Sequence, residues 1–110
     1  MQLERAIRSA LYLYPKKGDY TAVLEFFRTE RVLELSRESG GFLGASVNVP
    51  VSQAGPLLVI AAWREEADYL RWVASPVRAA FTPRLTELLE REPVAGEMYS
   101  IARELPGTRS

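Results

Sequence analysis

The feature that most restricts the fold of this chain is an unbroken run of apolar residues, Leu57–Trp63. A strand with one wet face alternates apolar and polar residues, so a run without alternation predicts a strand that is buried on both faces. A short buried helix is the competing interpretation. The run is short, contains Val59 and Ile60 and follows Gly55-Pro56, and these features favour a strand.

Strand and helix patterns are arranged around this run in a recognisable order. The expected elements are a strand over residues 7–14, a helix over 19–38, a strand over 45–51, the buried strand over 57–63, a helical stretch over 64–90 and a strand over 96–103. The order β-α-β-β-α-β is that of the split β-α-β, or ferredoxin-like, fold. We therefore predict an α+β domain in which the helices cover one face of a four-stranded antiparallel sheet.

Local signals set the expected ends of the helices. Asp19 is a suitable N-cap for the first helix, and Gly40-Gly41 is expected to end it. Ser75-Pro76 and Thr82-Pro83 each place a capping residue before a proline, so the second helical stretch is predicted to restart twice. The stripe expected to be buried in that stretch consists of Ala67, Leu70, Ala74, Val77, Phe81, Leu85 and Leu88.

The length of 110 residues corresponds to one domain. We expect a single ferredoxin-like domain over residues 1–110, with a core over about 6–103 and a tail over 104–110. The first five residues lack the charged-then-apolar pattern of an export signal, and no apolar run is long enough to span a bilayer. The expected location is the cytoplasm.

The composition excludes several kinds of chemistry. The chain contains no Cys and no His, which rules out disulfides, a thiolate metal site, a His-ligated haem and a Ser-His-Asp triad. We therefore expect no metal and no cofactor. Lys plus Arg and Asp plus Glu both number 14, so the net charge is zero and gives no reason to expect nucleic acid or a membrane as a partner.

The far side of the predicted sheet is expected to need a cover. Half of the side chains of Leu57–Trp63 face away from the helices, and large contiguous apolar surfaces are seldom left in water. The simplest cover is an identical sheet related by a two-fold axis. We predict a homodimer formed through this face.

Two segments of the chain resemble the antibiotic biosynthesis monooxygenase (ABM) family. Residues 63–72, read as WREEADYLRW and followed by Ser75-Pro76, resemble the family's second-helix segment. Residues 40–44, read as GGFLG, resemble the turn that enters its second strand, and Lys17-Gly18 matches the loop after its first strand. The resemblance extends over residues 6–103 and implies a dimeric α/β barrel with one pocket per subunit between sheet and helices.

The haem-degrading branch of this family is a poor match. That branch uses an Asn on the first strand, a Trp at the end of the second-helix segment and a His ligand ten residues later. Trp72 matches the Trp, but the His position falls near Thr82 and the Asn position near Leu11. Haem degradation is therefore not expected.

A second branch, of cofactor-independent oxygenases that convert polycyclic phenols to quinones, is a partial match. Its pockets use a Trp, a Tyr six residues later, an Asn and an Arg. Trp63 and Tyr69 have the required spacing, and Arg84 is a plausible counterpart of the Arg. The Asn position is occupied by Val59, which is a departure from the pattern.

The resemblance and the residues together give a set of candidate site residues. Tyr69, Arg84 and Asn48 are the expected catalytic residues, and Trp63, Trp72 and Phe81 are expected to bind the substrate. Each has a structural alternative: the aromatic residues can be core packing, Arg84 can lie on a solvated face, and Asn48 can point to either side of its strand.

Two functions remain open at this point. The first is a monooxygenase-like oxidoreductase, needing no cofactor, that oxidises a small aromatic, phenolic or enolisable molecule inside an apolar enclosure. The second is a non-catalytic dimeric domain that binds a small molecule or serves an accessory role on the same fold.

Overall fold

A computed structural model describes residues 6–107 of the chain. Residues 1–5, where no export signal was found, and residues 108–110, the end of the predicted tail, lie outside the described residues. The elements in chain order are β1 (Ile7–Leu13), η1 (Lys16–Gly18), α1 (Tyr20–Thr29), α2 (Val32–Glu38), β2 (Phe42–Asn48), β3 (Leu57–Trp63), α3 (Glu66–Val73), α4 (Pro76–Thr86), β4 (Val94–Ala95) and β5 (Tyr99–Ser100).

The strands form one antiparallel sheet with β3 inside it. The order is β2-β3-β1-β4. The short strands β4 and β5 both pair with β1, β4 with its C-terminal half and β5 with its N-terminal end. β3 lies between β1 and β2, with Ala61 opposite Ser9 on one side and opposite Ala45 on the other. The prediction of a strand over Leu57–Trp63 is confirmed, and a helix there is excluded.

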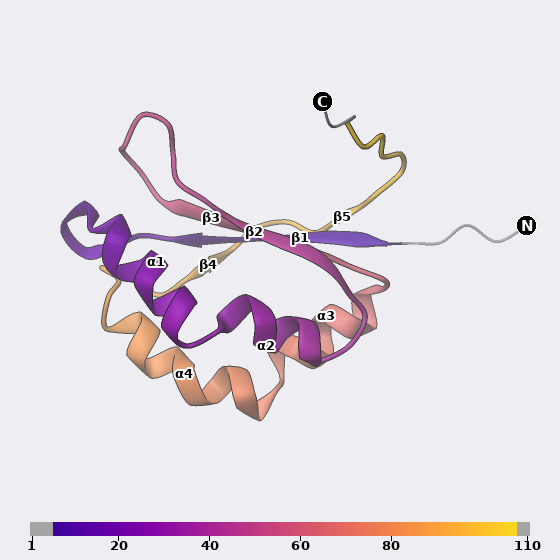
Figure 1. The fold of residues 1–110 in the computed structure, drawn as a ribbon, viewed down its shortest axis with the longest axis horizontal. Helices are drawn as coiled ribbons and strands as arrows, with labels where there is room; N and C mark the ends of the chain where they lie inside the picture. The colour runs from indigo at the N-terminus through magenta and orange to yellow at the C-terminus, as the bar shows by residue number, and fades with distance from the viewer. Residues whose placement is uncertain (1–5, 108–110) are drawn as a thin grey trace, which may run out of the picture.

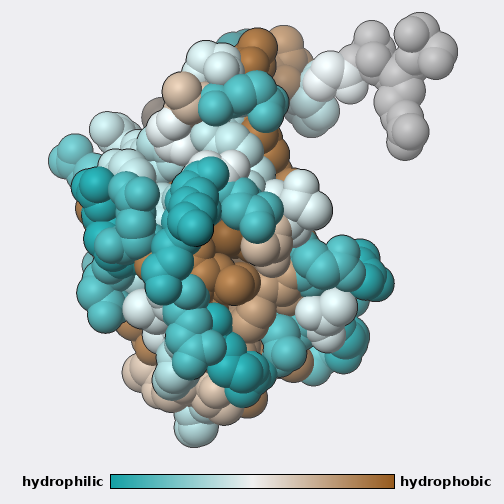
Figure 2. Space-filling view, turned by 90° about the vertical axis from the view of Figure 1, so that its left-hand side faces the viewer, coloured by the Kyte–Doolittle hydropathy of each residue, from teal (hydrophilic) through white to brown (hydrophobic). Residues whose placement is uncertain are grey.

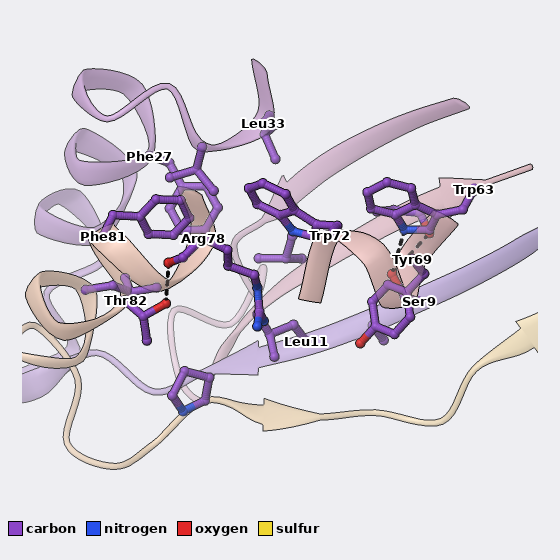
Figure 3. A pocket seen from close by; sticks show the side chains of 16 residues that line it. Ser9, Leu11, Phe27, Leu33, Trp63, Tyr69, Trp72, Arg78, Phe81 and Thr82 are labelled. Carbon is purple, nitrogen blue, oxygen red and sulfur yellow. Dashed lines mark hydrogen bonds between the residues drawn. The ribbon is translucent and has the colours of Figure 1, made fainter. Parts of the chain in front are cut away.

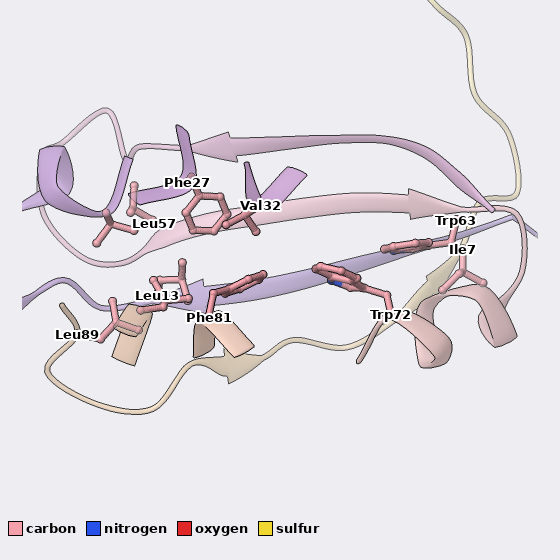
Figure 4. Close-up of a cluster of buried hydrophobic side chains, with 11 residues drawn as sticks. Ile7, Leu13, Phe27, Val32, Leu57, Trp63, Trp72, Phe81 and Leu89 are labelled. Atoms are coloured by element: carbon pink, nitrogen blue, oxygen red, sulfur yellow. The ribbon is translucent and has the colours of Figure 1, made fainter. Parts of the chain in front are cut away.

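All four α-helices lie on one side of the sheet, as Figure 1 shows. The predicted ferredoxin-like arrangement, an antiparallel sheet with helices on one face, is therefore confirmed. The core lies between the two layers and is drawn in Figure 4. Its buried members are Ile7, Leu13, Val23, Phe27, Val32, Leu57, Trp63, Trp72, Phe81, Leu85 and Leu89.

The first helix differs from its prediction because it is broken. Asp19 caps α1 as expected, accepting a hydrogen bond from the backbone N–H of Ala22 at 3.1 Å. The helix ends at Thr29, because Arg31 adopts a left-handed conformation with φ 54°. α2 then begins at Val32 and ends at Glu38, before Gly40 (φ 100°). Neither Gly nor Pro marks the break at Arg31, so the sequence contained no signal for it.

The second helical stretch restarts once rather than twice. The Ser75 hydroxyl accepts a hydrogen bond from the backbone N–H of Val77 at 3.1 Å, which confirms the restart at Ser75-Pro76. The restart predicted at Thr82-Pro83 is wrong, because Pro83 lies inside α4. The Thr82 hydroxyl donates to the backbone carbonyl of Arg78 at 2.7 Å instead of capping a new helix.

The predicted buried stripe is correct for two residues of α4, wrong for Val77 at the start of α4, which is 46% exposed, and wrong in α3. Phe81 and Leu85 are buried, but Leu70 is 50% exposed and Ala67 is exposed. Asp68 and Trp72 are buried in α3 instead. A buried carboxylate was not expected on an inward face, because Asp is rarely buried without a partner.

The outer strands also differ from prediction. β2 begins at Phe42 rather than Ala45, and its register shifts between Phe42 and Gly44. The last strand, predicted over 96–103, is two short segments, β4 and β5.

None of the helices in residues 6–107 is long and apolar enough to cross a membrane. At the end of the molecule seen in Figure 2, hydrophilic side chains surround a hydrophobic patch.

Candidate functional site

A cavity of about 80 Å³ lies between the helices and the inner face of the sheet. Its walls are mainly aromatic and aliphatic, and Figure 3 shows its lining side chains. The aromatic members are Phe27, Trp63, Tyr69, Trp72 and Phe81, and the polar members are Ser9, Arg78 and Thr82.

Strand periodicity builds the floor of the cavity. Successive side chains of a strand point to opposite faces, so every second residue of β1 and β3 faces the helices. Ser9 and Leu11 come from β1, and they lie opposite Ala61 and Val59 of β3. The uninterrupted apolar sequence of β3 thus supplies an apolar floor on this side of the sheet.

Trp63 closes one end of the floor and belongs to the core as well as to the cavity wall. It is 1% exposed, and its ring meets the rings of Phe42 and Tyr69 edge to face at 5.6 and 6.1 Å between centroids. The indole N–H donates to the Ser9 hydroxyl at 3.3 Å, which donates in turn to the Ala61 carbonyl at 3.5 Å. Ser9, which the sequence analysis did not single out, therefore fixes the orientation of the indole.

Tyr69 brings a polar group to the cavity from α3. Its ring is half-buried against Trp63, and its hydroxyl makes no hydrogen bond with any residue of the 6–107 segment. The hydroxyl is not fully buried, because no buried side-chain oxygen or nitrogen in the described residues lacks a partner. The Tyr69 hydroxyl is consequently available to a bound molecule.

Trp72 and Phe81 form the aromatic wall opposite the floor. Trp72 is 8% exposed and Phe81 is 5% exposed, and their rings lie 6.2 Å apart at a tilted angle. Trp72 lies in the last turn of α3 and Phe81 in the middle of α4, so the turn that contains Ser75 brings the two rings together.

Arg78 is the only cationic side chain in the lining, and the sequence analysis did not single it out. It is half-buried, and Figure 3 shows it extending from α4 toward Leu11 of β1. A signal for its position was present in the sequence. Positions 78, 81, 82 and 85 share one face of a helix, so a buried Phe81 and Leu85 imply that Arg78 also faces inward.

The structure does not bring Asn48 and Arg84 to this cavity. Asn48 lies opposite Leu58 on the far face of the sheet, where its side chain donates to the Leu58 carbonyl at 2.8 Å. It is exposed there because it has the strand parity that points away from the helices. Arg84 is exposed on the outer side of α4 and forms an ion pair with Glu30 of the α1 C-terminus.

Among the described residues, no carboxylate lines the cavity. Asp68, the buried acid nearest in sequence to Tyr69, is used structurally: it accepts hydrogen bonds from the Glu65 backbone N–H at 3.2 Å and from Arg71 at 2.9 Å. Within residues 6–107 no group of three acidic, His or Cys side chains is placed to hold a metal ion. The polar chemistry of the cavity thus consists of the Tyr69 phenol, the Ser9 and Thr82 hydroxyls and the Arg78 guanidinium.

Known structures share this fold over nearly the whole chain. A monooxygenase from Streptomyces coelicolor, ActVA-Orf6, described in complex with nanaomycin D, has a TM-score of 0.71 and 21% identity, covering 96% of this chain and 94% of its own. A conserved protein from Methanosarcina mazei has a TM-score of 0.74 and 18% identity, covering 88% and 93%. The haem degrader MhuD from Mycobacterium tuberculosis, described with two haems bound, has a TM-score of 0.73 and 15% identity, covering 91% and 99%. At these identities the likeness shows the fold alone.

The sequence comparisons give the family. No curated protein sequence matches the chain. The family model described as antibiotic biosynthesis monooxygenase matches residues 7–84, which include β1, the whole helical layer up to Arg84, and the two strands β2 and β3. The chain therefore belongs to the antibiotic biosynthesis monooxygenase family, as the motifs at 40–44 and 63–72 predicted.

Proposed function

We propose that the chain is an ABM-type monooxygenase that oxidises a small phenolic or enolisable substrate in the cavity between sheet and helices. The observation that carries the proposal is an apolar, aromatic enclosure in which the Tyr69 hydroxyl has no partner among the described residues. Family membership and the monooxygenase from Streptomyces coelicolor among the structural neighbours support it. Asn48 and Arg84 lie outside the cavity and have no part in the proposal.

The proposed reaction is balanced without a bound redox group. A CH₂ group activated by an aromatic ring or carbonyl reacts with O₂ to give C=O and water, with one oxygen atom entering the product and the other leaving in water. The ionised substrate supplies the electrons. Since no carboxylate lines the cavity, the substrate must be acidic enough to ionise in water, and a hydrogen bond from Tyr69 would stabilise the anion.

The size of the cavity limits the substrate. Its volume of about 80 Å³ is smaller than the roughly 150 Å³ of an engineered apolar cavity that accepts benzene. We therefore propose a substrate with one ring or a short enolisable chain, which enters with some movement of the wall. Haem degradation is not proposed, because the chain has no His and a porphyrin exceeds this volume.

A non-catalytic role in binding small molecules is the second candidate. It is favoured by two features of the lining. Val59 lies on the floor where the oxygenase branch would have Asn, and among the described residues the lining has no carboxylate that could act as a general base. On this alternative the cavity binds the same class of small molecule without oxidising it.

We also propose that a second copy of the chain covers the outer face of the sheet. Ala10, Leu58, Ile60 and Ala62 point away from the helices along the two central strands, and each is only partly buried in the single chain. This face of β1 and β3 is apolar and shows no charged residue between Arg8 and the loop after β1. The same face of a second copy would cover it with equally apolar side chains.

Oxygen consumption by the purified chain tests the proposal. The substrates are a panel of single-ring phenols with a free para position and of short 1,3-diketones, which ionise in water and have a carbon that can become C=O, without added metal or flavin. Consumption above the spontaneous rate, with an equal amount of oxidised product, is expected. Binding of a panel member without oxygen consumption would favour the non-catalytic role. Absence of both binding and consumption would contradict both candidates.

A further inference from the structure

Arg78 differs from every other arginine in residues 6–107. Six of these arginines form ion pairs, namely Arg8, Arg28, Arg31, Arg71, Arg84 and Arg91. Three others, Arg37, Arg64 and Arg103, are exposed to water. Arg78 alone is half-buried, has no acidic partner among the described residues and lines the cavity.

The surroundings of Arg78 leave its charge without a partner in the described chain. The residue is only partly buried, so water still reaches the guanidinium, and a ligand that entered the cavity would replace that water and would have to supply hydrogen-bond acceptors. The nearby lining is Trp72, Phe81, Leu11 and Thr82, and the Thr82 hydroxyl already donates to the Arg78 backbone carbonyl. No side chain in the lining supplies a carboxylate.

A bound anion would supply what the cavity lacks. Guanidinium groups bind carboxylates through two parallel hydrogen bonds, and such charge-assisted bonds are stronger than neutral ones. The apolar floor of β1 and β3 would hold the uncharged part of the ligand, and the Tyr69 hydroxyl of α3 offers a second donor in the lining.

We infer that the cavity selects small ligands carrying a carboxylate, and that Arg78 is the residue that selects them. This inference rests on the proposed use of the cavity as a ligand site and specifies the substrate class. Arg78 lies one turn from Phe81 on α4, and its side chain lines the same cavity and extends toward Leu11 of β1 (Figure 3). Arg84, two turns further along α4, is paired with Glu30 and is not available for this role.

A pair of matched probes tests the inference without requiring turnover. Benzoate joins one ring to a carboxylate, and benzamide has nearly the same shape without the charge. Their dissociation constants for the full chain are measured at neutral pH by titration calorimetry or by ligand-induced shifts in melting temperature. We expect benzoate to bind at least about tenfold more tightly than benzamide, as expected for a charge-assisted hydrogen bond.

Four variants assign the preference to one residue. Arg78→Gln should reduce the benzoate-to-benzamide preference to about one, and Arg78→Lys should keep part of it because the positive charge remains. Arg84→Gln tests the rival arginine of the same helix. Arg37→Gln removes an exposed charge elsewhere and controls for the change in net charge. Circular dichroism confirms that each variant is folded.

The outcomes separate this inference from the proposed reaction. A preference that disappears in Arg78→Gln and persists in Arg84→Gln and Arg37→Gln supports it, even if oxygen is never consumed. No preference in the unmodified chain, or no binding of either probe, overturns it. A preference that survives Arg78→Gln, or is lost in Arg84→Gln, also overturns it. Oxygen consumption with uncharged substrates alone would leave the monooxygenase proposal standing and reject the carboxylate requirement.

Discussion

Replacing Tyr69 by Phe is expected to leave the packing around the ring unchanged and to remove a hydroxyl group from the cavity. Its ring packs edge to face on Trp63, and the ring of Phe would keep that contact. The hydroxyl has no partner in the described chain, so removing it leaves no protein group unsatisfied. If the hydroxyl stabilises an anionic intermediate, its loss acts on the reaction and not on folding.

We predict that Tyr69→Phe lowers the turnover number by about a hundredfold with little change in stability. Oxygen consumption and urea unfolding measure the two effects. Tyr14→Phe is the matched control, because Tyr14 lies outside the cavity and its ring face packs under the Arg91 guanidinium. Equal rates for Tyr69→Phe and the unmodified chain would remove Tyr69 from the proposed mechanism.

Gly41 is required by the position of a buried carboxyl group. It adopts φ +71°, and a Cβ at this position would overlap the carboxyl group of Asp68. That carboxylate closes the capping box at the start of α3, so displacing it also exposes the Glu65 backbone N–H. Gly18 has a similar φ of +66° but open space around it.

We predict that Gly41→Ala destabilises the fold more than Gly18→Ala. Gly18→Ala should cost about 1–2 kcal/mol for the left-handed conformation alone. Gly41→Ala should cost a further 1–3 kcal/mol, roughly, for the steric overlap. Urea unfolding of both variants measures the difference, and equal losses would mean that Asp68 moves aside without penalty.

The candidate site could be predicted only in part at the level of single residues. The spacing of Trp63, Tyr69 and Trp72 pointed to side chains that do line the cavity, since strand and helix periodicity fix which way they face. Arg84 was chosen as a plausible counterpart of the family's Arg, and Arg78 was not singled out. The helical face shared with Phe81 was the stronger physical signal, and it places Arg78 inward.

At the scale of elements, the turn between α3 and α4 sets the geometry of the aromatic wall. Ser75 caps α4 and Pro76 occupies its first turn, where a missing N–H costs little. The turn directs Trp72 and Phe81 toward each other at 6.2 Å. Its stability therefore matters for the cavity as well as for the helix.

We predict that Ser75→Ala lowers the free energy of unfolding by about 1 kcal/mol, because the Val77 backbone N–H loses its acceptor. Ser75→Asp should restore most of that stability, since Asp is an equally good N-cap. Urea unfolding compares the two variants. If Asp failed to restore what Ala removes, the lost stability would not come from capping.

Most of the elements followed from the sequence because period and cap signals agreed. The alternation of residues 7–14 and the Ser75-Pro76 pair predicted a strand and a helix start directly, and the apolar run of 57–63 was assigned to a strand over a short buried helix by its length, its β-branched residues and the preceding Gly55-Pro56. The break at Arg31 did not follow, because a left-handed Arg is held by its surroundings and not by its own preference. The restart predicted at Thr82-Pro83 was wrong because tertiary packing overrode the local capping signal. Phe81 and Leu85, on either side of the pair, both pack into the core.

At the scale of the whole molecule, the sheet has one covered and one open face. The helices protect the inner side, whereas the outer side of β3 presents Leu58, Ile60 and Ala62. This asymmetry is the reason to propose that a second copy completes the structure.

We predict that Ile60→Glu converts a dimer to a monomer, because a carboxylate placed between two sheets would be buried without a partner. Leu70→Glu is the control, since Leu70 is 50% exposed on α3 in the helical layer. Light scattering at micromolar concentration measures the mass of each. An unmodified chain that is monomeric, or an Ile60→Glu variant that stays dimeric, would contradict the proposed interface.

The central claim is that the cavity carries out the insertion of oxygen, and isotope labelling tests it most directly. The chain is supplied with ¹⁸O₂ and the panel substrate that is turned over fastest, and the product is analysed quickly because carbonyl oxygens exchange with water. The expected result is one labelled oxygen atom in each product molecule, with about a hundredfold less labelled product formed by Tyr69→Phe in the same time. Product oxygen derived from water alone, or equal labelling without the protein, would contradict it.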